Sequence, residues 1–210
     1  ALQGRYRWVV FPPSKTRPSA PVRNRYYGVF TDGRIKARGI ELQRRDTPKI
    51  VRDFQAETLR LLAAAPDSAS LREKAPETLE VARRYIRRIN SRDVDLEDLA
   101  IRRRLSKDPG SYAHNVPQAA AAQELVKAGA RVSAGQEVSY IVTDANRLRT
   151  LATPLELADA PPSYDARKYI RLITSSANTL IQPLGYTLKE DPLKILKNEK
   201  RPTGSLETFR

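Results

Sequence analysis

The pattern of apolar and polar residues near the N-terminal end of the chain predicts a β-hairpin. Residues Tyr26–Phe30 are strand-like, residues 31–33 (Thr-Asp-Gly) have the composition of a tight turn, and residues 34–38 alternate basic and apolar side chains. Side chains in a strand point alternately to opposite faces, so the basic side chains of the second strand share one face. Those side chains are Arg34, Lys36 and Arg38. The pattern therefore predicts a ribbon with one cationic face.

A further strand is expected at residues 5–11, where the sequence becomes fully apolar before two prolines end it. This strand and the hairpin carry large apolar side chains, namely Trp8, Val10, Phe11 and Phe30. Three strands cannot bury both of their faces by themselves. The pattern therefore predicts that the remainder of a sheet, supplied from outside these residues, covers the apolar side chains.

Helical spacing of apolar residues dominates the rest of the chain. Helices are expected at about residues 48–65, 69–89, 116–129 and 164–185. Short strands are expected at residues 99–105 and 135–142, and residues 143–162 are expected to form a linker. Strands followed by a mainly helical region predict an α+β fold.

The charge of the chain points to a polyanionic partner. The sequence has 38 Lys and Arg against 24 Asp and Glu, a net charge of +14, and its pI is about 10.2. Residues 1–45 alone hold 11 basic and two acidic residues, a net charge of +9. A nucleic acid is the favoured partner on this basis, although a basic ribosomal or membrane-surface protein would also be cationic.

Other classes of site are excluded by composition. The chain has no cysteine, which excludes disulfides, thiolate metal sites and cysteine nucleophiles, and its single histidine cannot build a metal site alone. The sequence also contains no apolar run of membrane-spanning length and no apolar signal core, so a cytoplasmic protein without a membrane partner is expected.

Basic and aromatic residues gather at the ends of the predicted hairpin. Arg23, Arg25, Arg44 and Arg45 flank it, with Tyr26 and Tyr27 among them. A guanidinium group can bind two phosphate oxygens at once, and an aromatic ring can lie against a sugar or base. The hairpin is therefore the candidate nucleic-acid contact surface. Four further arginines on the outer face of the 69–89 helix fit either a DNA contact or a solvated helix face.

Three motifs here resemble the end of the palm domain in archaeal and eukaryotic family B DNA polymerases. They are Arg-Asn-Arg-Tyr at 23–26, Arg-Gly-Ile-Glu at 38–41 and Arg-Arg-Asp at 44–46. In that family a basic tetrad that ends in tyrosine touches the minor groove of the primer–template duplex, and the following strand leads into the thumb domain. Asn24 departs from the family pattern, which has a basic residue at that position.

The resemblance continues along the chain. It includes a Leu-x-Ile strand at 99–101, a Pro-led and Ala-rich helix from Pro117, a Tyr-Ile-Val strand at 140–142, and a helix framed by Tyr-Asp-Ala at 164–166 and Gly-Tyr at 185–186. The resemblance implies a partial palm β-sheet at residues 1–46, whose strands complete a partner's sheet. A mainly helical thumb would follow at residues 47–190, and a basic tail at residues 191–210.

The resemblance also implies which residues contact DNA and where catalysis lies. The expected DNA contacts are Arg23, Asn24, Arg25, Tyr26, Arg38, Arg44, Arg45, Arg102, Lys107, Tyr112 and His114. His114 could equally be a loop histidine with a structural role. Nucleotidyl transfer in this family uses two metal ions held by aspartates. Asp93 and Asp95 follow a helix instead, where turn and helix-cap roles are the better interpretation.

No catalytic or metal-binding residue is thus expected in this chain. The resemblance implies the small subunit of a naturally split polymerase, inactive alone. The large subunit would carry the exonuclease, the fingers and most of the palm, and would bind Mg²⁺. The alternative is a stand-alone basic RNA-binding or ribosomal protein, although the sequence lacks the usual RNA-binding motifs. In the tail, Leu206 and Phe209 have the spacing of the apolar plug in sliding-clamp-binding peptides, and a disordered terminus is the alternative.

Overall fold

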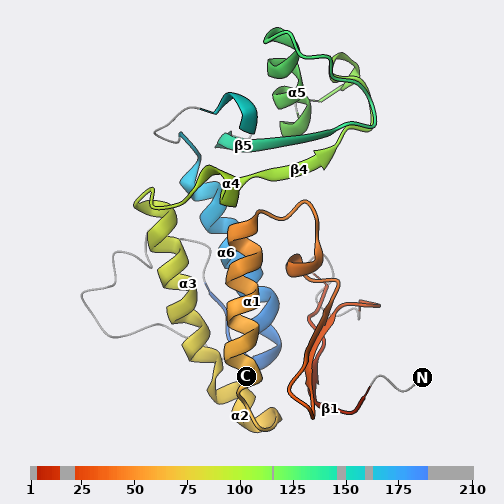
Figure 1. Cartoon of the computed structure of the whole chain (residues 1–210). Coiled ribbons are helices and arrows are strands. Elements are labelled where there is room, and N and C mark those ends of the chain that lie inside the picture. Colours follow the sequence, from red (N-terminus) through yellow and green to blue (C-terminus); the bar gives the residue numbers. More distant parts are fainter. Residues whose placement is uncertain (1–3, 15–21, 115, 146–149, 159–162, 189–210) are drawn as a thin grey trace. The chain divides into compact units, whose positions relative to one another are not determined.

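The structure of the chain is a computed structural model that describes residues 4–14, 22–114, 116–145, 150–158 and 163–188 (Figure 1). The tail with Leu206 and Phe209 lies outside the described residues. Contacts divide the chain into two compact units. Unit 1 contains residues 1–44, 51–87 and 171–210, and unit 2 contains residues 45–50 and 88–170.

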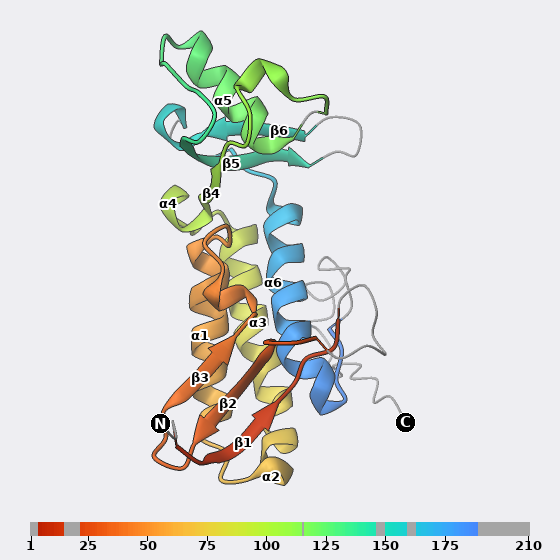
Figure 2. The ribbon, with the colours of Figure 1, turned by 90° about the vertical axis from the view of Figure 1, so that its right-hand side faces the viewer.

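The predicted hairpin is confirmed as part of an antiparallel three-stranded sheet in unit 1. Its strands are β1 (Tyr6–Val10), β2 (Tyr26–Phe30) and β3 (Ile35–Arg38), in the order β1-β2-β3 (Figure 2). The turn between β2 and β3 uses Gly33 at a φ of 87°, and the Asp32 carboxylate accepts hydrogen bonds from the backbone and side chain of Arg34. These interactions lower the pKa of Asp32. The turn therefore fixes the register that the alternating sequence suggested.

Four helices have the positions that the apolar spacing predicted, with one correction. They are α1 (Lys49–Ala63), α2 (Ser68–Glu73), α3 (Ala75–Asn90) and α6 (Ala166–Ile181). The single helix expected at 69–89 is two helices, α2 and α3. The cause is Pro76, which has no N–H to donate to the carbonyl of Arg72, one turn earlier.

The core of unit 1 lies where these helices meet one face of the sheet. The side chains of Tyr27 and Val29 on β2 are fully buried, so the expectation that the Tyr27 ring lies on the nucleic-acid contact surface is wrong. The Tyr27 hydroxyl donates a hydrogen bond to the carbonyl oxygen of Leu180 on α6, and burial raises the pKa of Tyr27. The predicted apolar stripe of α2 and α3 is also buried, at Leu71, Ala75, Leu79, Ala82, Ile86 and Ile89.

The expectation that Trp8 and Phe30 need an external sheet is wrong. Trp8 is only 5% exposed. Its Nε1 donates a hydrogen bond to the carbonyl oxygen of Ala65 at 3.1 Å, and its ring packs edge-on against the Tyr27 ring. Phe30 is 4% exposed and stacks against Tyr6. Phe11 does fit the expectation, since it is 66% exposed.

Unit 2 contains a second antiparallel sheet and the Ala-rich helix. Its strands are β4 (Ile101–Arg104), β5 (Glu137–Ala145) and β6 (Thr150–Pro154), preceded by α4 (Leu96–Leu99). Helix α5 (Pro117–Lys127) begins with the expected proline and buries Ala119, Ala121 and Ala122. The prediction that residues 143–162 form only a linker is wrong, because residues 150–154 pair with β5 as a strand.

Four short 3₁₀ turns complete the described elements, which together form a mixed fold of helices and small antiparallel sheets. The turns are η1 (Glu41–Gln43), η2 (Pro109–Ser111), η3 (Leu155–Leu157) and η4 (Gln182–Leu184). Within the described ranges, no helix is both long and apolar enough to cross a membrane.

Candidate nucleic-acid interface

The two ends of the hairpin are held together by close backbone contact. Asn24 has a φ of 59° and Gly39 a φ of 66°. A Cβ atom on Gly39 would lie 2.4 Å from the carbonyl oxygen of Asn24, so only glycine fits there. Asparagine is one of the few residue types other than glycine that adopts a positive φ readily. Asn24, two residues before β2, thus lies directly beside Gly39, which follows β3.

This arrangement places an aromatic ring among exposed cations. Tyr26 on β2 lies opposite Arg38 on β3, and such cross-strand partners share one face of the sheet. The Tyr26 ring is half-buried and leans against Phe11, with ring centroids 6.1 Å apart. Arg23 and Arg38 are exposed, and the described residues provide neither with an ion-pair partner. Their guanidinium groups are therefore available to phosphate oxygens.

Arg25, in contrast, points into unit 1. It is 9% exposed and donates hydrogen bonds to the carbonyl oxygen of Pro13 at 2.8 Å and to the hydroxyl of Thr179 at 3.1 Å. Its guanidinium also lies 3.9 Å from the carboxylate of Glu41. These contacts give Arg25 a structural role that the sequence did not reveal, and its predicted DNA contact stays a prediction.

Glu41 is the centre of this buried network. Its carboxylate accepts hydrogen bonds from the Thr179 hydroxyl on α6 at 3.1 Å and from the Gln55 amide on α1 at 2.9 Å. Gln55 also accepts from the backbone N–H of Leu42 at 2.6 Å. The network of Arg25, Glu41, Gln55 and Thr179 therefore ties the exit of the hairpin to two helices. Glu41 could have been suspected from the Arg-Gly-Ile-Glu motif, whereas Gln55 and Thr179 are ordinary polar residues in amphipathic helices.

A second group of predicted contacts lies in unit 2. Arg45 and Arg102 are exposed, while Arg103 pairs with Asp46 at 2.8 Å and Arg104 donates to the carbonyl oxygen of Gly135 at 2.5 Å. Only some of the arginines in this part of the chain are thus available for a ligand. Arg44, in unit 1, is exposed and makes an interaction within the protein.

The loop after β4 holds Lys107, Tyr112 and His114. The Tyr112 hydroxyl accepts hydrogen bonds from the backbone N–H groups of Ser106 at 2.9 Å and Lys107 at 3.3 Å. His114 is exposed and lies with Tyr112 on the wall of a hollow of about 630 Å³ formed by this loop, α5 and β6. The structure thus brings Lys107 and Tyr112 into direct contact and places His114 beside Tyr112.

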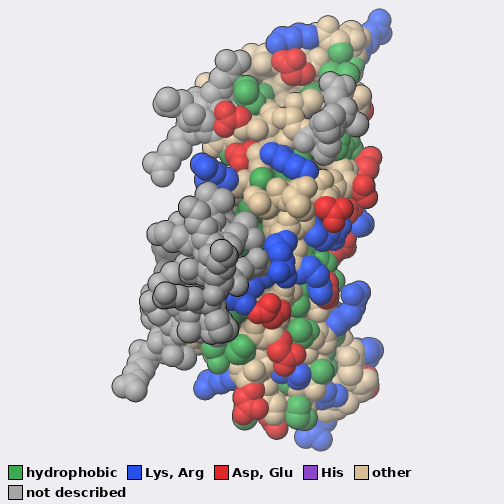
Figure 3. Space-filling model, turned by 90° about the vertical axis from the view of Figure 1, so that its left-hand side faces the viewer, with side chains coloured by type: hydrophobic (Ala, Val, Ile, Leu, Met, Phe, Trp, Pro, Cys, Tyr) green, Lys and Arg blue, Asp and Glu red, His purple; other side chains and the backbone are tan. Residues whose placement is uncertain are grey.

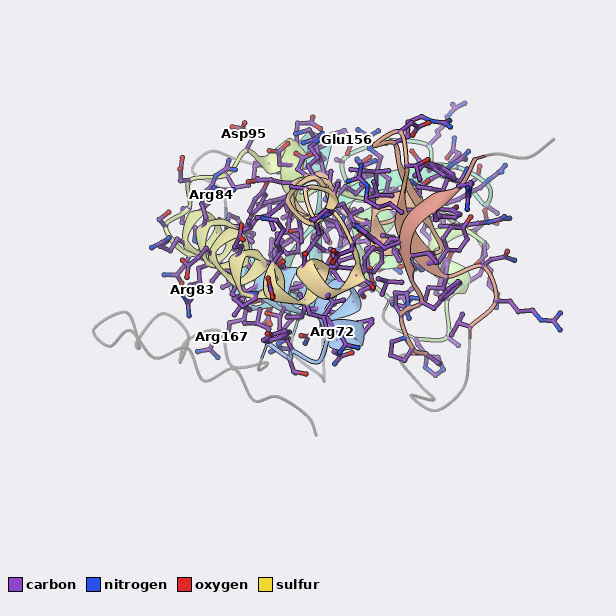
Figure 4. The ribbon with its side chains drawn as sticks, turned by 90° about the horizontal axis from the view of Figure 1, so that it is seen from below. Arg72, Arg83, Arg84, Asp95, Glu156 and Arg167 are labelled. Carbon is purple, nitrogen blue, oxygen red and sulfur yellow. The ribbon has the colours of Figure 1, made fainter. Side chains whose placement is uncertain are left out.

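Two arginines of α3 pair with acidic side chains. Arg83 pairs with Glu80, and Arg84 pairs with Glu57 on α1. Figure 4 shows Arg83 and Arg84 on the outer side of α3, and Figure 3 shows basic and acidic side chains interspersed on the α3 side of the protein. This pairing favours the solvated-face interpretation of the helix. The Arg84–Glu57 pair also provides a control position for the hairpin arginines.

The carboxylates do not gather into a metal site in the described part of the chain. No group of three or more His, Asp or Glu side chains there could hold a metal ion. Asp95 occupies the N-cap position of α4, where its side chain makes no capping hydrogen bond, and Asp93 lies in the preceding turn.

Comparison with known proteins places the chain in a family. The family described as DNA polymerase family B matches residues 22–199. The chain belongs to DNA polymerase family B. It is 27% identical over 172 residues to a DNA polymerase of Thermococcus sp. strain GE8. That alignment covers 80% of this chain and 10% of the Thermococcus protein. It is 26% identical over 186 residues to a DNA polymerase of Desulfurococcus sp. strain Tok, covering 87% and 23% respectively.

A solved family B structure shares the fold. The family B DNA polymerase from the archaeon Pyrobaculum calidifontis aligns with a TM-score of 0.65 and 23% identity, covering 86% of this chain and 22% of that one. The resemblance to archaeal family B polymerases is thereby confirmed. The chain spans between 10 and 23% of the length of these three polymerases.

Membership of family B makes the role of the exposed hairpin arginines testable. Replacing Arg38 with alanine should flatten the plot of log affinity for a primer–template duplex against log salt by about one unit, because the predicted contact of Arg38 with a phosphate would be lost. Fluorescence anisotropy over a series of salt concentrations measures this slope. Arg84→Ala is the matched control, because that guanidinium is also exposed but is paired with Glu57. Equal salt slopes for Arg38→Ala and the unmodified chain would show that Arg38 does not contact a DNA phosphate.

Proposed function

We propose that this chain forms the end of the palm and the thumb of a family B DNA polymerase and grips primer–template DNA behind the primer terminus. The observation that carries the proposal is the hairpin face on which Arg38 lies opposite Tyr26, with Arg23 exposed at its entry. In this assignment residues 1–46 are the palm end and residues 47–190 the thumb. The remaining predicted DNA contacts belong to the same proposal.

The chemistry of the hairpin suits an enzyme that moves along DNA. Contacts to phosphate oxygens fix the position of a duplex and carry no sequence information. Readout of the minor groove distinguishes little beyond A·T from G·C. A tyrosine ring that lies opposite an arginine on one sheet face can therefore hold any sequence. A polymerase that must release and rebind successive base pairs needs this kind of contact.

The catalytic centre is proposed to lie on a separate large chain with the exonuclease, the fingers and most of the palm. Nucleotidyl transfer needs metal ions held by clustered carboxylates, and the described carboxylates of this chain do not fit such a site. We assign no catalytic step to this chain and place Mg²⁺ on the large chain. The exposed side chains of Tyr6, Val9 and Phe11 on β1 and just after it support a protein partner on this sheet.

Reconstitution tests the proposal. The chain alone should not extend a primer, and mixing it with the large chain should give primer extension that depends on Mg²⁺. Affinity for a primer–template duplex should also exceed affinity for a structured RNA at matched salt, which the RNA-binding alternative would reverse. Primer extension by this chain alone, in a preparation shown to be free of other polymerases, would overturn the proposal that the catalytic centre lies on a separate large chain. Clamp binding through Leu206 and Phe209 and a cytoplasmic location stay predictions.

A further inference from the structure

Two backbone N–H groups and one side-chain hydroxyl in the loop after β4 converge on one oxygen atom. The backbone N–H groups of Ser106 and Lys107 donate to the Tyr112 hydroxyl oxygen at 2.9 and 3.3 Å, and the Ser106 hydroxyl lies 3.4 Å from the same oxygen. Ser106 and Lys107 are exposed, and the Tyr112 side chain is half-buried. One tyrosine oxygen thus occupies a small cradle of donors at the protein surface.

The cradle has the properties of an anion site. Successive backbone N–H groups that point to one place are a recurring way of binding phosphate. Hydrogen bonds to a charged oxygen are about twice as strong as those to a neutral one. The Ser106 side-chain hydrogen bond, with the two backbone N–H groups and the Lys107 charge, lowers the pKa of Tyr112, so these surroundings favour negative charge on the oxygen.

The neighbouring carboxylate, Asp108, is hydrogen-bonded to a different loop. Asp108 follows Lys107 directly, and its Oδ1 accepts a hydrogen bond from the backbone N–H of Ala134 at 2.8 Å. That carboxylate is therefore engaged with the turn before β5. The Lys107 side chain supplies a positive charge beside the cradle. A phosphate oxygen would gain the two backbone donors, the serine hydroxyl and a nearby ammonium group.

We propose that the backbone N–H groups of Ser106 and Lys107 form a binding site for one phosphate oxygen of DNA, and that the Tyr112 hydroxyl fills this site when DNA is absent. The proposal rests on the proposed function, in which this region grips a duplex. It changes the role expected for Tyr112. The tyrosine hydroxyl occupies the two backbone donors in the absence of DNA and yields its place to the phosphate, instead of contacting DNA itself.

The proposal predicts that removing the hydroxyl improves binding. Tyr112→Phe leaves both N–H groups without the competing acceptor, so the full chain should bind inorganic phosphate about fivefold more tightly, the worth of one hydrogen bond. Titration of the ¹⁵N-labelled full chain with phosphate should shift the amide signals of Ser106 and Lys107, both in the unmodified chain and in the variant. Tyr186→Phe, a half-buried tyrosine in unit 1, is the control and should leave phosphate affinity unchanged.

A second variant separates the cradle from the charge of the lysine. Ser106→Ala keeps both backbone N–H groups and removes one donor, so phosphate should still shift the two amide signals, with affinity reduced about threefold. Because the unmodified chain is titrated as well, the proposal can be judged even when a variant folds poorly. Phosphate that shifts neither amide signal in the unmodified chain, or a Tyr112→Phe chain that binds phosphate no more tightly, would overturn the site.

A failure of the proposed phosphate site can be distinguished from a failure of the proposed DNA-binding function. Duplex binding by the unmodified chain is measured in parallel. Duplex binding without phosphate shifts at Ser106 and Lys107 would refute the cradle and leave the DNA grip intact. Phosphate shifts without duplex binding would keep the anion site and refute the grip. Tighter duplex binding by Tyr112→Phe would support both.

Discussion

Replacing Trp8 with alanine should lower the free energy of unfolding of the chain by about 4 kcal/mol, the cost of deleting a large buried aromatic side chain. Trp8 is 5% exposed, donates a hydrogen bond to the carbonyl oxygen of Ala65, and packs edge-on against Tyr27. Its loss leaves a cavity and removes one of the two side-chain donors, Trp8 and Arg7, that bind the Ala65 carbonyl oxygen. Urea unfolding, followed by circular dichroism, measures the change.

Phe11 provides the matched comparison, because it is an aromatic residue just after the same strand but is 66% exposed. Phe11→Ala should change the free energy of unfolding by less than about 0.5 kcal/mol, as expected for a surface substitution. It should instead weaken association with the proposed large chain. A loss of stability as large as that of Trp8→Ala would mean that Phe11 packs inside the chain and does not face a partner.

Replacing Arg25 with alanine should lower the free energy of unfolding by about 3 kcal/mol, because removal of one member of a buried ion pair leaves the other without compensation. Pro13 and Thr179 lose the donors from the guanidinium, and Glu41 loses its nearby positive charge. Glu41 keeps its hydrogen bonds from Gln55 and Thr179, which holds the cost to the lower end of the range. Denaturant titration measures the effect.

Arg23→Ala is the control for this prediction, since Arg23 is exposed at the start of the same hairpin. It should leave stability almost unchanged. The salt dependence of DNA binding then decides whether Arg25 also touches a phosphate. A salt slope that flattens by about one unit in Arg25→Ala supports a contact between Arg25 and a phosphate, and an unchanged slope refutes that contact. Equal unfolding midpoints for Arg25→Ala and the unmodified chain would show that the buried network contributes nothing to stability.

The sequence predicted those parts of the fold that depend on local patterns. The hairpin follows from alternation around the Asp32–Gly33 turn, and α6 follows from apolar residues at helical spacing. The start of α5 follows from the proline at its first position. In each case the side-chain pattern within one element is sufficient to define it.

The parts that were missed depend on contacts between distant segments. Arg25 meets Thr179, which lies 154 residues further along the chain, so its sequence context gave no sign of burial. The strand at residues 150–154 is short and ends in proline, and it is defined by pairing with β5. Trp8 finds its acceptor 57 residues away, in the turn after α1. The cradle around Tyr112 consists of backbone groups, which no side-chain pattern reveals.

Among the described strands, each small sheet has a basic strand at one edge. Strand β3 carries Lys36 and Arg38, and strand β4 carries Arg102 and Arg104. Charged edge strands discourage other copies of a chain from adding to a sheet. Two of these cations, Arg38 and Arg102, are proposed to hold DNA, and they therefore also protect the protein from self-association. Variants that remove these charges would confuse weakened DNA binding with aggregation, whereas replacement by glutamate keeps the edge charged and separates the two effects.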